Sequence, residues 1–94
     1  MTNTPIQITK NVTEPEAIVI LNQCLQYFHT HQITWRQVQQ QANEIYCAFC
    51  TQKKCSDDFF FIIEALDSLD VMTPSQRDQA IADADYFCEY GYRR

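Results

Sequence analysis

The sequence predicts an all-α protein, a compact four-helix bundle with a short N-terminal arm. It has one glycine and three prolines in 94 residues, a composition that favours long regular elements joined by short turns over a loop-rich scaffold or a many-stranded sheet. Three Thr-x-x-Glu or Thr-x-x-Gln patterns mark helix starts, and four segments carry apolar residues at helical spacing. The expected helices are residues 14–29, 35–51, 57–70 and 74–90.

The first helix is expected to begin at a capping box formed by Thr13 and Glu16, with Pro15 in its first turn. We expect residues 1–12 to form a flexible or extended arm and residues 13–94 to form a single helical domain. Apolar residues at helical spacing predict that one side of this helix faces the core. They are Ala17, Ile20, Leu21, Cys24, Leu25 and Phe28.

The second helix has the best-specified start in the chain. Thr34 and Gln37 have the spacing of a capping box, and Ile33 and Val38 occupy the two positions of a hydrophobic staple. Most of the glutamines are expected to lie on the solvent side. The predicted core side comprises Trp35, Val38, Ala42, Ile45, Tyr46 and Phe49.

The third helix is the most apolar segment, with Ser56 as its predicted N-cap. Its core side is predicted to comprise Phe59, Ile62, Ile63, Leu66 and Leu69. Phe60 and Phe61 project roughly 60° and 160° beyond one edge of that stripe. Two adjacent phenylalanines are costly to leave in water, so we expect another helix or a second copy of the chain to cover them. Of these two arrangements we favour the second copy, so we expect the chain to form a homodimer.

The fourth helix is expected to start at Thr73 and to end before Gly91, a C′ residue. Its apolar side is narrow and consists of Ala80, Ile81, Ala84, Phe87 and Cys88. Tyrosines lie among carboxylates on the opposite side, and Tyr is enriched at protein-binding hot spots. With the off-stripe phenylalanines, the predicted partner-binding residues are Phe60, Phe61, Asp83, Tyr86, Glu89 and Tyr90.

The negative charge is confined to the C-terminal half of the chain. Residues 57–89 contain nine acidic residues and one basic residue, Arg77, which gives a charge of −8 for that stretch against −5 for the whole chain. A direct nucleic-acid binder needs a basic face, so we expect no nucleic acid partner. The charge instead favours a protein partner with a basic surface.

The cysteines suggest an alternative functional hypothesis, a metal site. Cys47 and Cys50 have the spacing of a metal knuckle, and Cys55 could supply a third thiolate. A fourth ligand is not evident, because the chain has no second knuckle of the usual pattern. We therefore expect no cofactor, and a small structural zinc-binding module that uses these three cysteines is the alternative. Cys24 and Cys88 are expected in the core.

Nothing in the sequence indicates catalysis. His29 and His31 could pair with a cysteine as a base and nucleophile, but no strand-turn-helix setting supports it, and the single glycine, Gly91, leaves no phosphate-binding loop. No apolar run reaches the ~18–20 residues of a membrane span, and residues 1–13 lack the pattern of a signal peptide. We therefore expect a cytoplasmic protein without enzymatic activity.

The sequence thus predicts a small protein-interaction module, which is an adaptor, regulator or inhibitor. It would bind a basic protein through an acidic and aromatic helical surface. One specific form is an inhibitor encoded by a mobile element that blocks a nucleic-acid-binding protein by placing carboxylates where phosphates would lie. The charge distribution motivates this form.

Overall fold

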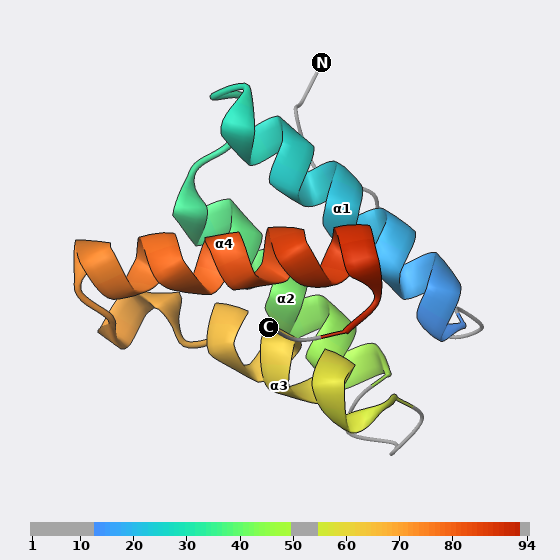
Figure 1. Ribbon diagram of the computed structural model, residues 1–94. Helices are drawn as coiled ribbons and strands as arrows, with labels where there is room; N and C mark the ends of the chain where they lie inside the picture. Colours follow the sequence, from blue (N-terminus) through green and yellow to red (C-terminus); the bar gives the residue numbers. More distant parts are fainter. Residues whose placement is uncertain (1–12, 50–54, 93–94) are drawn as a thin grey trace.

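A computed structural model describes residues 13–49 and 55–92 (Figure 1). These residues form four α-helices and one short 3-10 helix, and they contain no strand. The elements are α1 (Glu14–His29), α2 (Trp35–Ala48), α3 (Asp57–Leu66), η2 (Leu69–Val71) and α4 (Pro74–Tyr90). The predicted all-α four-helix bundle is therefore confirmed. The expected arm, residues 1–12, lies outside the described residues.

The helices enclose a common core. In Figure 1, α4 crosses the front of the molecule, with α1 above it and α3 below it, and α2 lies behind. Both α2 and α4 pack against α1 and α3, so each of these helices buries one side against two neighbours. The longest helix, α4, has 17 residues, and among the described residues no helix is long and apolar enough to cross a membrane.

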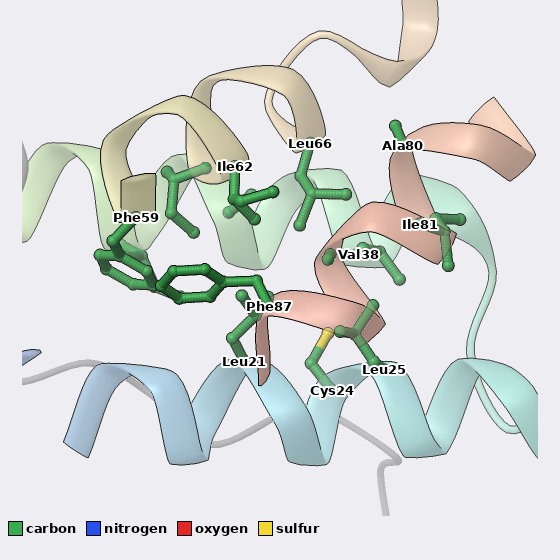
Figure 2. Close-up of a cluster of buried hydrophobic side chains, with 14 of the residues drawn as sticks. Leu21, Cys24, Leu25, Val38, Phe59, Ile62, Leu66, Ala80, Ile81 and Phe87 are labelled. Atoms are coloured by element: carbon green, nitrogen blue, oxygen red, sulfur yellow. The ribbon is translucent and has the colours of Figure 1, made fainter. Parts of the chain in front are cut away.

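An aromatic group in the core is built around Phe59 of α3 (Figure 2). Its ring stacks on that of Phe87 in α4, with centroids 5.8 Å apart, and the ring of Phe49 meets it edge-on at 6.0 Å. All five residues of the predicted α3 stripe are buried. The predicted stripe is confirmed, and it joins α3 to both α4 and the end of α2.

The predicted helix starts are confirmed. Thr73 N–H donates to Gln76 Oε1 (3.0 Å) and Gln76 N–H donates to Thr73 Oγ1 (3.2 Å), and Thr13 and Glu16 make the same reciprocal pair. The bonds from Thr13 lower the pKa of the Glu16 carboxyl, because they favour its charged form. At the start of α2, Thr34 N–H donates to Gln37 Oε1 (3.0 Å).

Glu14 ties the start of α1 to the start of α3. Its Oε1 accepts the backbone N–H of Ser56 at 2.6 Å, and its Oε2 accepts the Ser56 hydroxyl at 3.1 Å. The same hydroxyl oxygen accepts the Phe59 N–H at 3.3 Å, as predicted for the N-cap of α3. Glu14 therefore acts across two helices, a role that its position in the first turn of α1 does not reveal.

The end of α1 is a Schellman motif with an unusual residue. Gln32 N–H donates to Tyr27 O (2.9 Å) and His31 N–H donates to Phe28 O (3.0 Å). This geometry places His31 at φ +63°, in the left-handed region that glycine normally occupies at this position. At the end of α4, Gly91 has φ +82°, as predicted.

Substitutions at His31 and Gly91 are expected to change the free energy of unfolding in opposite directions. We expect His31→Gly to raise the free energy of unfolding by about 0.5–1 kcal/mol, because it removes left-handed strain. We expect Gly91→Ala to lower it by about 1 kcal/mol. An added Cβ at Gly91 would meet no atom within 4 Å, so the loss would come from the backbone alone. Urea unfolding of both variants checks this, and effects of equal sign would contradict it.

Two predicted helix ends are wrong. The described part of α2 ends at Ala48 instead of residue 51, because Phe49 leaves the helical region at φ −134°, ψ −55°; residues 50–51 lie outside the described residues. Helix α3 ends at Leu66 instead of residue 70. There the Ser68 hydroxyl donates to the Glu64 carbonyl (3.1 Å), which competes with the helical hydrogen bond.

The segment after α3 is held by side chains from other helices. Gln39 Oε1 of α2 accepts the Asp70 N–H at 2.9 Å. Arg77 of α4 donates from Nη1 to the carbonyl of Met72 at 2.9 Å, and its guanidinium carbon lies 4.3 Å from the ring centroid of Trp35. The one basic residue of the acidic stretch therefore stabilises the fold.

One glutamine of α2 is an exception to the predicted pattern. Most of the glutamines were expected on the solvent side, but only 2% of the surface of Gln41 is exposed. Its Nε2 is buried and has no hydrogen-bond partner among the described residues. A buried amide without a partner is destabilising, because it loses its hydrogen bonds to water without replacement.

Candidate protein-binding surface

Three tyrosines gather at the end of α4. The rings of Tyr86 and Tyr90 have centroids 4.5 Å apart, and the ring of Tyr92 lies 5.8 Å from the first and 6.3 Å from the second. The left-handed Gly91 reverses the chain and lets Tyr92 return toward α4. Tyr90 and Tyr92 are 54% and 53% exposed. We call these three residues the tyrosine cluster.

The predicted carboxylates flank the tyrosine cluster on two sides. Asp83, Tyr86 and Tyr90 have the i, i+3, i+7 spacing of one helix side. Asp83 is half-buried, and its Oδ1 accepts a hydrogen bond from Gln79 Nε2 at 2.8 Å. Glu89 is exposed and lies on the other flank, toward α1. The structure thus brings the four predicted α4 residues to one outer surface.

The two off-stripe phenylalanines of α3 have different surroundings. Phe60 is half-buried, packs against the core and lies 5.8 Å from the ring of Tyr46 in α2, measured between centroids. Phe61 is 54% exposed. For Phe60 the first of the two expected arrangements is observed, because α2, another helix of the same chain, packs on it through Tyr46. For Phe61 the expected cover stays a prediction.

A groove between α1 and α4 lies beside Glu89. Its volume is about 440 Å³, and its lining residues are Asn22, Gln26 and His29 from α1 and Asp85, Cys88 and Glu89 from α4. His29 Nε2 lies 2.7 Å from Asp85 Oδ2, and both side chains are partly exposed. An ionised carboxylate can only accept, so the imidazole Nε2 carries the proton in this bond.

The thiol of Cys88 shares this groove with His29 and Asp85, but its chemistry is not that of a nucleophile. Burial and the nearby Asp85 charge raise the pKa of Cys88 to about 12. An activated cysteine needs a pKa that is lowered, because the thiolate is the reactive form. The Cys88 thiol therefore stays protonated at neutral pH. Burial also raises the pKa of Cys24 to about 12.

These pKa values predict unequal thiol reactivity. In reduced native protein at pH 8, we expect iodoacetamide to modify Cys47, which is exposed, at least about tenfold faster than Cys24 and Cys88. Mass spectrometry of peptides after timed labelling measures the rates, and the same labelling in urea is the control, where all sites should react alike. Fast native labelling of Cys24 would contradict its burial.

The structure leaves the predicted cysteine cluster untested. Cys47 is exposed, with Sγ 3.9 Å from Asn43 Oδ1, and Cys55 is half-buried against the core. Cys50 lies outside the described residues. In the part of the chain that the structure describes, no three potential metal ligands come together. The zinc module stays a prediction, and elemental analysis of the purified protein decides it.

Comparison with known proteins adds no assignment. The chain matches no protein-family model, no curated protein and no solved structure. The functional interpretation therefore rests on the surface itself.

Sequence reasoning missed the pair of His29 and Asp85 because 56 positions separate the two residues. The sequence contains only a weak indication of this groove. Asp85 and Glu89 are one turn apart on α4, as are Asn22 and Gln26 on α1, and each pair lies on one side of its helix. That the two pairs share a groove follows only from the packing of α1 against α4.

Proposed function

We propose that the chain is a protein-interaction module without enzymatic activity, and that it binds a protein with a basic surface through the outer side of α4. The tyrosine cluster is the observation that carries this proposal. Tyrosine side chains offer large, rigid contact area at a low cost in conformational entropy. Three such rings in mutual contact, two of them more than half exposed, form a suitable hot spot.

The charge around the cluster supports a basic partner. Asp83, Asp85 and Glu89 lie on the same helix, within a stretch that carries nine acidic residues and one basic residue. Arg77, the basic residue, is engaged by backbone carbonyls and by the Trp35 ring. Complementary charge would speed association and make it sensitive to salt.

A regulatory form of this proposal is an inhibitor, such as a mobile element encodes, that acts in the cytoplasm on a nucleic-acid-binding protein. Its α4 carboxylates would occupy positions that phosphates take in the target's groove. Nucleic acid and this chain would then compete for the target. Simultaneous binding of both would remove this form and leave the general proposal intact.

The proposal includes self-association through α3, in which Phe61 would contact a second copy. Phe61 is 54% exposed, and burial of that remaining part would contribute about 1–1.5 kcal/mol per side chain. Light scattering at tens of micromolar tests the homodimer, with Phe61→Ser as the variant that should be monomeric. A monomeric wild-type protein would contradict it.

Affinity capture from extracts of the native host tests the interaction. We expect the wild-type chain to retain a basic protein that Tyr90→Ala with Tyr92→Ala loses and that Phe61→Ala still retains. Both variants remove exposed aromatic rings, so the comparison separates specific binding by the tyrosine cluster from nonspecific hydrophobic binding. Equal capture by all three proteins would overturn the assignment of the binding surface to α4.

A further inference from the structure

We infer that the groove between α1 and α4 binds the guanidinium group of an arginine side chain on the basic partner. This inference rests on the proposed function and makes it specific, because it names the chemical group that the partner inserts. The groove lies on the α1 flank of α4 and is lined by Asn22, Gln26, His29, Asp85, Cys88 and Glu89. Its volume of about 440 Å³ falls within the ~300–1,000 Å³ range of ligand-binding clefts.

The lining supplies hydrogen-bond acceptors from both walls. Asp85 and Glu89, one turn apart on α4, contribute carboxylate oxygens, and Asn22 and Gln26, one turn apart on α1, contribute amide oxygens. A guanidinium presents five N–H donors in one plane, which suits acceptors placed on two facing sides. Carboxylate contacts with arginine are also charge-assisted and therefore stronger than neutral hydrogen bonds.

The bond between His29 and Asp85 prepares the groove for this ligand. His29 Nε2 holds Asp85 Oδ2 at 2.7 Å, which fixes the orientation of the carboxylate before a ligand arrives. A preformed acceptor reduces the entropy lost on binding. His29 is therefore a positioning residue in this proposal, whereas Asp85 and Glu89 contact the ligand.

Other ligand classes fit the groove less well. Two carboxylates disfavour an anion. A lysine ammonium has three donors at a single point and uses fewer of the spread acceptors than a guanidinium does. A metal ion needs several ligands at one point, and among residues 13–49 and 55–92 no group of three His, Cys, Asp or Glu residues meets that need.

A pair of short peptides tests the inference without the natural partner. The probes are Ac-Gly-Arg-Gly-NH2 and Ac-Gly-Lys-Gly-NH2, titrated into 15N-labelled protein at low salt. We expect the arginine peptide to shift the side-chain amide signals of Asn22 and Gln26 and to bind more tightly than the lysine peptide. Shifts confined to other regions, or equal affinity for the two peptides, would overturn the guanidinium assignment.

A matched pair of variants separates the groove from general charge. Glu89→Gln and Glu64→Gln remove the same charge from exposed positions on α4 and α3, respectively. We expect the first to weaken arginine-peptide binding about tenfold and the second to leave it within about twofold. Equal losses would mean diffuse attraction and would refute the groove. Because this test omits the partner, its failure leaves the tyrosine-dependent capture unaffected, and the failure of that capture leaves the peptide result unaffected.

Discussion

Phe59→Ala is expected to lower the free energy of unfolding by about 3–5 kcal/mol, the cost of removing a large aromatic side chain from a packed core. Phe59 is fully buried and contacts the rings of both Phe49 and Phe87. The substitution would therefore leave a cavity where α2, α3 and α4 meet. Since small domains have total stabilities of about 5–15 kcal/mol, this single change removes a large part of the total.

Urea unfolding followed by circular dichroism measures this loss, and Phe61→Ala is the matched control. Phe61 is the same residue type two positions later in α3, but it is 54% exposed. At a protein concentration where the chain is monomeric, we expect the control to change the free energy of unfolding by less than about 1 kcal/mol. Similar losses in the two variants would contradict the assignment of Phe59 to the core and Phe61 to the surface.

Gln41→Met is expected to raise the free energy of unfolding by about 1–3 kcal/mol. The wild-type amide nitrogen is buried without a hydrogen-bond partner among the described residues, and methionine removes that group while keeping a similar unbranched shape. The matched control is Gln40→Met at the neighbouring exposed position of α2, for which we expect a change within about 0.5 kcal/mol.

Thermal and urea unfolding of the two glutamine variants measure the difference. A loss of stability in Gln41→Met would show that the amide makes a compensating hydrogen bond, for example to a buried water molecule. In that case Gln41 would be a structural polar residue of the core. A gain confined to Gln41→Met supports the unpaired amide.

Local patterns in the sequence predict most of this fold because they encode local interactions. Capping boxes join residues three positions apart, and the start of every α-helix in the described residues is where its cap predicts. The apolar stripe of α3 is likewise set by helical spacing and is confirmed. The end of α3 was not predicted, because helical spacing does not show that the Ser68 hydroxyl bonds to the Glu64 carbonyl there. Nor does it show that Gln39 and Arg77, from other helices, hold the following segment.

On the candidate surface, too, local sequence predicts some features and contacts between helices determine the others. The spacing of Tyr86 and Tyr90 on α4 places them together, so sequence alone indicates one side of the surface. The burial of Phe60 against Tyr46 and the bond from His29 to Asp85 depend on how helices pack. Helical periodicity predicts which residues lie on the outer side of a helix, but it does not predict which residues of other helices they contact.

The most direct test of the proposed function is the salt-dependent affinity of the captured partner for wild-type protein, Tyr90→Ala and Phe61→Ala. Isothermal titration calorimetry at about 50 and 200 mM salt gives the six dissociation constants. We predict that affinity falls with salt and that Tyr90→Ala weakens binding at least about tenfold, while Phe61→Ala stays close to wild type. An affinity that is independent of salt and unchanged in Tyr90→Ala would contradict binding through the acidic, tyrosine-rich side of α4.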